Sequence, residues 1–261
     1  MVASDLIRDI SGGNLVVAAF LIGSICMILT TLGSIISLLG RRLSTRFLDA
    51  GLGFSAGVMI VASFTSLLLP AIEMGGIARG LIGFITGAGV ISFIESRLPH
   101  EHLVKGYEGP DHLRGRLKAI WMMVIAIIIH NFPEGLAVGA STAYSIDEGL
   151  LTAIAIGLQD IPEGIAVSLP LILIGRRIRQ AVFIGFLSGA SEPLMAIIPV
   201  LLIGLSGEIL PYALAFASGS MIFVVSHEVI PDTHSHGNEN LATLGLIIGF
   251  LVMLYLDTMF G

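Results

Sequence analysis

Two short stretches of the chain repeat the same pattern of polar side chains. HNFPEG begins at residue 130 and QDIPEG begins at residue 159, and the two match position by position in chemical type. In each, the first and fifth residues are spaced i, i+4 and the second and fifth i, i+3, so on an α-helix all three share one face. With a glutamate farther along the chain, the candidate ligands are His130, Asn131, Glu134, Gln159, Asp160, Glu163 and Glu192. Imidazole, carboxylate and amide groups that converge in this way are typical of a divalent metal site.

The apolar surroundings of the four acidic residues in this set favour a shared metal ion. An ionised carboxylate at the centre of a transmembrane helix costs about 2.5 to 3.5 kcal/mol, so four of them cost roughly 10 kcal/mol or more. A single buried polar residue usually serves as an interhelical hydrogen bond, but seven at one depth are too many for that role. With one histidine, no cysteine and many oxygens, the set suits Zn²⁺, Fe²⁺, Mn²⁺ or Cd²⁺ and argues against a Cu(I) site.

The composition indicates the medium in which this site must lie. Of the 261 residues, 55% are hydrophobic and 12% are charged, and the mean hydropathy of +0.95 lies outside the usual range of soluble domains. The 32 glycines suit close helix packing in a membrane. The net charge of −6 offers no basic surface for nucleic acid. Cys26, the one cysteine, cannot form an intramolecular disulfide and is interpreted as a packing residue.

Apolar runs long enough to cross a bilayer recur along nearly the whole chain. They predict an all-α membrane protein of eight transmembrane helices, which form one domain over residues 1–261. The expected helices span 14–39, 47–69, 77–95, 119–144, 149–175, 180–205, 210–230 and 241–260. The fourth and fifth carry the repeated stretches in opposite directions near the membrane midplane, as in an inverted-repeat bundle. We therefore expect the metal site between the fourth, fifth and sixth helices, and a cytoplasmic loop at 96–118.

The distribution of basic residues predicts the orientation of the chain. Eleven of its 13 lysines and arginines fall in loops that are cytoplasmic if the N-terminus is outside, and the two exceptions are Arg8 and Arg79. Short cytoplasmic loops are enriched in these residues. The prediction is a multi-pass protein of the cell membrane whose N- and C-termini both lie outside.

HNFPEG, QDIPEG and the stretch SHEVIPDTHSHG at 226–237 resemble the ZIP family of metal-ion transporters, nearest its prokaryotic GufA-like branch. The resemblance covers essentially the whole chain. It implies a binuclear metal centre in a homodimer that works by an elevator-like motion. The implied main site consists of His130, Glu134, Gln159, Glu163 and Glu192, and the implied second site of Asn131, Asp160, Glu163 and Glu192. Many family members have histidine at the position of Gln159, which weakens the expectation of strict zinc selectivity.

The resemblance also implies a path for the ion on each side of the centre. The implied exit-side metal residues, on the cytoplasmic side, are His227, Glu228, Asp232, His234 and His236. The implied entrance path, on the outer side, consists of Met59, Ser66, Glu73, Met221 and Asp257. The first three recur every seven residues, which predicts one face of the second helix. From the residues alone, the two methionines also suit core packing, and the exit-side set also suits a solvated loop.

The predicted function is secondary transport of divalent transition metal ions into the cytoplasm by alternating access. Zinc is the expected ion, with Cd²⁺, Fe²⁺ and Mn²⁺ as further candidates, and each would be bound as a substrate, with no cofactor. Because the chain contains no nucleotide-binding motif, transport should follow ion gradients. The expected partners are the metal ions, the lipid bilayer and a second copy of the chain, and no enzymatic activity is expected.

Two alternatives remain open at this stage. The first is a proton-coupled transporter of a small organic solute, since buried acids also serve proton relays, although few aromatic or basic groups near the midplane could bind a solute. The second is an intramembrane metalloenzyme, which needs an open coordination position and a general base. The inverted pair of ligand sets does not suit such a one-sided active site.

Overall fold

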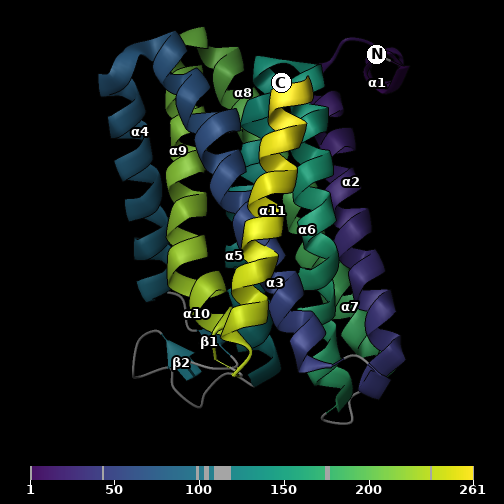
Figure 1. The fold of residues 1–261 in the computed structure, drawn as a ribbon. Coiled ribbons are helices and arrows are strands. Elements are labelled where there is room, and N and C mark those ends of the chain that lie inside the picture. The colour runs from purple at the N-terminus through teal and green to yellow at the C-terminus, as the bar shows by residue number, and fades with distance from the viewer. Residues whose placement is uncertain are drawn as a thin grey trace.

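The computed structural model describes residues 2–42, 44–97, 100–102, 106–108, 119–173, 177–235 and 237–260. Long helices follow one another in alternating directions and form a bundle (Figure 1). The elements of the first half are α1 (Val2–Ser11), α2 (Leu15–Ile36), the 3₁₀ helix η1 (Ser37–Arg42), α3 (Thr45–Val61), the π-helix η2 (Ala62–Leu68), α4 (Leu69–Arg97), and the strands β1 (His100–His102) and β2 (Gly106–Glu108). Those of the second half are α5 (Ala119–Tyr144), α6 (Ile146–Leu173), α7 (Ile178–Gly189), α8 (Ser191–Leu205), the 3₁₀ helix η4 (Gly207–Ile209), α9 (Leu210–Val224), the π-helix η5 (Val225–Val229), α10 (Ile230–Thr233) and α11 (Glu239–Phe260).

The helices agree with the sequence prediction in general placement, and α5 has the predicted bounds. Local chemistry explains several of the ends. The side chain of Asn14 accepts a hydrogen bond from the backbone N–H of Val16 at 2.9 Å and so caps α2. The hydroxyl of Ser44 accepts one from the N–H of Phe47 at 3.2 Å and caps α3.

Four features differ from the sequence prediction. An additional helix, α1, precedes the first predicted one. The predicted sixth helix is broken at Ala190 into α7 and α8, and Pro193 two residues into α8 suits a helix start but not a helix interior. The seventh continues through η5 and α10 to Thr233. Within the predicted loop 96–118, β1 and β2 pair antiparallel with His100 opposite Glu108.

In the part of the chain whose placement is described, six stretches of helix are long and apolar enough to cross a membrane. They are Leu15–Leu39, Thr45–Arg97, Ile146–Leu169, Ile178–Leu205, Gly207–Thr233 and Glu239–Met259. The second has 53 residues and is interrupted at Gly76, whose φ of 78° belongs to the left-handed region that favours glycine. The fold is therefore that of a helical membrane protein, while the count of eight spans stays a prediction.

The long helices divide into two bundles, which we call the first bundle (α2, α5, α6, α7 and α8) and the second bundle (α3, α4, α9 and α11). Within each, helices meet through glycine. A methyl group on Gly164 of α6 would overlap the Thr30 carbonyl oxygen of α2, and one on Gly87 of α4 would overlap the Phe216 carbonyl oxygen of α9. Small residues allow such close backbone approach, and dispersion forces and lipid exclusion then stabilise it.

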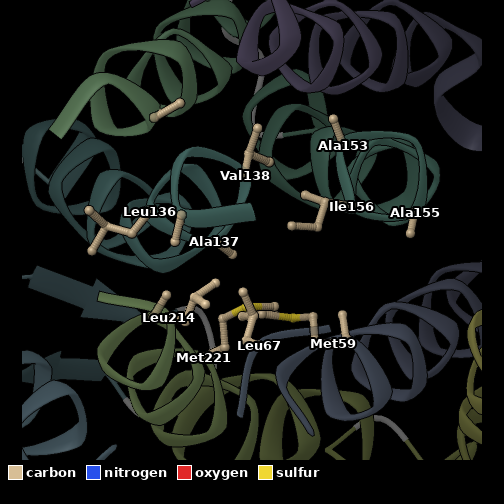
Figure 2. Packing of buried hydrophobic residues seen from close by; sticks show 14 of the residues in the cluster. Met59, Leu67, Leu136, Ala137, Val138, Ala153, Ala155, Ile156, Leu214 and Met221 are labelled. Carbon is tan, nitrogen blue, oxygen red and sulfur yellow. The ribbon is translucent and has the colours of Figure 1, made fainter. Parts of the chain in front are cut away.

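The two bundles meet along a surface that we call the seam. Buried apolar side chains fill it (Figure 2). Met59, Leu67 and Met221 of the second bundle lie across from Leu136 and Ile156 of the first. In the part of the chain that the structure describes, a hydrogen bond crosses the seam: the hydroxyl of Ser55 in α3 donates to the carbonyl oxygen of Gln159 in α6 at 3.0 Å. The seam therefore joins side chains, whereas the bundles are held internally by backbone contacts.

The two ends of the chain lie at the same end of the molecule, and the β1–β2 hairpin lies at the opposite end (Figure 1). This arrangement agrees with the predicted placement of both termini on one side of a membrane. Which compartment that side faces stays a prediction from the basic residues.

Candidate metal centre

Three predicted acidic ligands converge where α5 and α6 face each other. Glu134 of α5 and Asp160 and Glu163 of α6 each bring a carboxylate oxygen to within 4.8 Å of the other two. Their residues are 0%, 1% and 8% exposed. The spacing within QDIPEG places Asp160 and Glu163 on one face of α6, and that face turns toward Glu134. Three anionic groups at this separation inside an apolar bundle can share one cation.

The amide of Gln159 is oriented by a hydrogen bond within this cluster. Its Nε2 donates to Glu134 Oε1 at 2.5 Å, which fixes the direction of its own Oε1 within the amide plane. Among the described residues, Gln159 Oε1 has no hydrogen-bond partner although it is buried. A buried acceptor without a donor costs about 1 to 3 kcal/mol. A bound cation would remove that cost.

Glu192 enters the cluster because the chain breaks at Ala190. It lies in the first turn of α8, where the partial positive charge of a helix start favours a carboxylate. Its Oε1 accepts hydrogen bonds from Asn131 Nδ2 at 2.7 Å and from Thr30 Oγ1 at 3.1 Å. Its Oε2 is buried without a hydrogen-bond partner in the described part of the chain. One oxygen is therefore held in place, and the other is open to a ligand.

A cysteine that the sequence did not mark as a ligand lies beside these acids. Cys26 Sγ, in the middle of α2, and carboxylate oxygens of Asp160 and Glu192 all lie within 4.8 Å of one another. Cys26 is fully buried in the hydrophobic core, so its interpretation as a packing residue holds in part. The position of Cys26 in the middle of its apolar run could have indicated that it lies at the depth of the acids. Which face of α2 meets the acids depends on tertiary packing.

The structure links six of the seven predicted ligands, Asn131, Glu134, Gln159, Asp160, Glu163 and Glu192, through these contacts. The seventh, His130, belongs to α5, but its side chain lies outside the described residues. Among the described residues, neither Asp160 nor Glu192 forms an ion pair with a lysine or arginine. Four buried acids at the centre of the first bundle thus form an anionic cage whose charge a divalent cation can neutralise.

The predicted entrance residues are brought together in part. The hydroxyl of Ser66 in η2 donates to Asp257 Oδ1 of α11 at 2.8 Å. Met59 and Met221 are fully buried, and both belong to the apolar cluster of the seam (Figure 2). Glu73 is exposed on α4. Met59 lies in α3, Ser66 in the π-helix η2 and Glu73 in α4, so the three belong to successive elements, and their common face stays a prediction.

The exit-side residues cluster around η5. His227 stacks its ring on Phe223 with centroids 5.2 Å apart, and its Nε2 lies 3.6 Å from Glu95 Oε1. Glu228 is buried beside it in η5. Glu95, near the end of α4, was not singled out in the sequence, although an acid that ends an apolar run is a detectable signal.

The rest of the exit-side set follows η5. Asp232 was expected in a loop but lies in α10, because the helix continues past Pro231, which occupies its first turn. His234 ends that helix, and its Nδ1 lies 2.8 Å from the hydroxyl of Thr233 and 3.0 Å from the Ile230 carbonyl oxygen. These contacts fix the ring close to its own backbone. His236 lies outside the described residues.

Fold and centre together define a class: helical membrane proteins that enclose a cluster of acids between their helices. Comparison with known proteins narrows this class. A sequence model of the family described as ZIP Zinc transporter matches residues 95–257, more than half of the chain. The chain belongs to the ZIP zinc transporter family, which confirms the resemblance seen in its motifs.

Named relatives agree with this assignment. The chain is 38% identical to the zinc transporter ZIPB of Bordetella bronchiseptica, over 100% of this chain and 88% of that protein. It is 38% identical to the zinc transporter GufA of Myxococcus xanthus, over 89% of this chain and 94% of that protein. It is 31% identical to the human zinc transporter ZIP11, over 83% and 89% of the two chains. The family and these relatives are zinc transporters, not enzymes, as the sequence predicted.

Proposed function

We propose that this protein is a secondary transporter of divalent transition metal ions, with zinc as its foremost substrate and Cd²⁺, Fe²⁺ and Mn²⁺ as further substrates. The observation that carries the proposal is the convergence of four buried carboxylates. Beside or within this cluster, oxygen atoms of Gln159, Asp160 and Glu192 have no hydrogen-bond partner among the described residues. A cluster of acids in an apolar bundle is costly by itself, and a divalent cation supplies a partner for every open oxygen. The zinc transporters among its relatives support the choice of ion.

The centre would hold two ions in adjacent positions. The main position takes His130, Glu134, Gln159, Glu163 and Glu192 as ligands, and the second takes Asn131, Asp160, Glu163 and Glu192. The hydrogen bond from Gln159 to Glu134 favours the first grouping, because it aligns the two side chains. The hydrogen bond from Asn131 to Glu192 favours the second. Glu163 lies within 4.8 Å of both Glu134 and Asp160, as a bridging ligand requires.

The ion would enter between the ends of η2 and α11 and leave toward the cytoplasm past η5. The Ser66–Asp257 hydrogen bond supplies oxygen ligands on the entrance side, next to Met59 and Met221. Glu95, His227 and Glu228 supply ligands on the exit side. Asp232, His234 and His236 complete the proposed exit set. Both termini would lie on the outer side of the cell membrane, since the two chain ends lie at the same end of the molecule and the basic loops favour the cytoplasm.

Transport would proceed by an elevator-like movement of the first bundle along the second, in a homodimer with eight spans per chain. The seam supports this mechanism, because it consists of apolar side chains with one crossing hydrogen bond among the described residues. Sliding along such a surface breaks few directional contacts. The break at Gly76 divides the 53-residue helical stretch into two proposed spans. With α5 as a further span, the six apolar stretches become the eight proposed spans. The dimer rests on the family resemblance.

The test is uptake by proteoliposomes that contain the purified full-length protein. We expect zinc accumulation that needs no ATP, follows the imposed zinc gradient and is inhibited by Cd²⁺ more strongly than by Mn²⁺. A Glu134→Ala variant of equal abundance in the liposomes is the matched negative control. Uptake that equals protein-free liposomes for all four ions would overturn the proposal.

A further inference from the structure

We propose that Cys26 is a thiolate ligand of the second metal position and makes that position prefer soft ions. This inference rests on the proposed function and deepens it. It adds sulfur, from α2, to a centre whose other ligands come from α5, α6 and α8. It also replaces the expectation, drawn from the sequence, of a site without cysteine.

The first support is geometric. Ligand atoms that share one Zn²⁺ lie within about 4.5 Å of one another, given Zn–S near 2.3 Å and Zn–O near 2.2 Å. Cys26 Sγ and oxygens of Asp160 and Glu192 already lie within 4.8 Å of one another without a metal between them. Tetrahedral coordination brings such atoms to about 3.7 Å, so a shift of up to about 1 Å closes the three ligands around one ion.

The second support is independent of the cysteine. Both carboxylate oxygens of Asp160 are buried, and in the described part of the chain neither accepts a hydrogen bond from a nitrogen or oxygen donor. Asp160 is 1% exposed, so its carboxylate is shielded from bulk water. The Cys26 thiol lies beside this carboxylate, on which the carboxylates of Glu134, Glu163 and Glu192 also converge. A carboxylate whose two oxygens lack hydrogen-bond donors, next to a sulfur atom, provides part of the coordination sphere of a thiophilic cation.

The position of Cys26 is held firmly. In this structure the thiol donates to the Ala153 carbonyl oxygen at 3.3 Å, which fixes the side chain toward α6. Thr30 lies one turn along the same face of α2 and donates to Glu192, so α2 presents two polar groups to the centre. Close contact of α2 with α6 at Gly164 keeps this face in register. When a metal binds, the S–H bond breaks, the sulfur–metal bond forms and the proton leaves to water.

A purely packing role makes a different prediction. A buried cysteine often behaves as a small apolar residue, and serine, which has nearly the same size, would then leave metal binding unchanged. A thiolate ligand instead stabilises Cd²⁺ and Zn²⁺ far more than Mn²⁺, which prefers oxygen. The contrast between soft and hard ions therefore distinguishes a ligand from a packing residue.

The experiment uses the full-length protein in lipid nanodiscs. Cadmium is titrated while calorimetry records binding and ultraviolet absorption records thiolate-to-cadmium charge transfer. Cys26 is the one cysteine of the chain, so any such absorption comes from it. We expect one thiolate–cadmium chromophore per chain. Cys26→Ser should abolish it and lower cadmium affinity at least about tenfold, with manganese affinity changed less than about threefold.

Controls separate this inference from the proposed function and from misfolding. Ser24→Ala, on the same helix but directed to the Phe20 carbonyl, should keep the chromophore. Manganese binding by Cys26→Ser shows that the variant is folded, and Cys26→Ala should behave like Cys26→Ser if the variant loses only the sulfur ligand. Stoichiometric cadmium binding to the wild type without charge-transfer absorption would overturn the role of Cys26 and leave the proposed function standing. Absence of all metal binding by the wild type would overturn both.

Discussion

The two bundles place their acidic residues at different depths. In the first bundle, Glu134, Asp160, Glu163 and Glu192 lie near the middle of the molecule, where burial is complete or nearly so. In the second, buried Asp49 and Glu95 and the half-buried Asp257 lie close to helix ends. Charge at the middle of a bundle cannot reach water at the membrane surface, whereas charge at the ends can. The first bundle therefore carries the proposed metal centre, and the second carries Glu95 and Asp257 of the proposed ion path.

The largest predicted effect follows from removing Glu163, the acid that the two proposed metal positions of the first bundle share. Glu163→Ala should lower the initial zinc uptake rate by about 100-fold or more, because both proposed positions lose an anionic ligand in a low-dielectric site. Uptake into proteoliposomes, normalised to inserted protein, measures this.

Asn131→Ala is the matched control for that prediction. Asn131 is neutral and belongs to the second position alone, and water can replace its amide oxygen, so uptake should fall less. If Asn131→Ala is as inactive as Glu163→Ala, or if Glu163→Ala transports at the normal rate, Glu163 does not bridge two ions.

Valine substitutions at two glycines of α4 test whether backbone contacts make the second bundle rigid. Gly87→Val should destabilise the protein by about 3 kcal/mol, at the upper end of overpacking costs, because the new side chain meets the Phe216 backbone of α9, which cannot turn away. Thermal unfolding followed by fluorescence-detected size exclusion measures the loss. Gly89→Val is the control, since a Cβ there meets nothing within 4 Å. Equal stability of the two variants would show that α4 and α9 are not held by backbone contact.

The smallest effect concerns the seam. Ser55→Ala removes the hydrogen bond to the Gln159 carbonyl oxygen, and such interhelical bonds average about 0.6 kcal/mol in membranes. The zinc uptake rate should therefore change by less than about threefold. Stopped-flow uptake with a zinc-sensitive dye in the liposome lumen resolves a change of this size. Complete loss of transport in Ser55→Ala would identify the seam as a fixed joint and contradict movement along it.

Much of the fold could be predicted from the sequence, because bilayer thickness sets helix length. The bounds of α5 were predictable since polar segments flank an apolar run. The cluster of Glu134, Asp160 and Glu163 was predictable because helical periodicity places the polar side chains of each repeat on one face. These predictions depend on local geometry and on the cost of buried charge.

The parts that could not be predicted depend on contacts between distant segments. The π-helices η2 and η5 have no sequence signal of their own, and η2 lies between Met59 and Glu73, where the sequence predicted one regular helix face. The break at Ala190 looked like continuous helix, because Ser191 and Pro193 occur within an apolar run. The approach of Cys26 to Asp160 is set by how α2 rotates against α6, which the α2 sequence does not encode by itself.

The placement of both chain ends at one end of the molecule has a practical consequence for engineering. Because residues near the N-terminus and the end of α11 emerge at the same end of the molecule, two copies can be joined head to tail in one polypeptide by a flexible linker. Both copies then enter the bilayer in the same sense without an added crossing segment. In such a tandem chain, one copy can carry an inactivating substitution while the other keeps the natural sequence. Transport by the tandem chain then shows whether the two copies work independently.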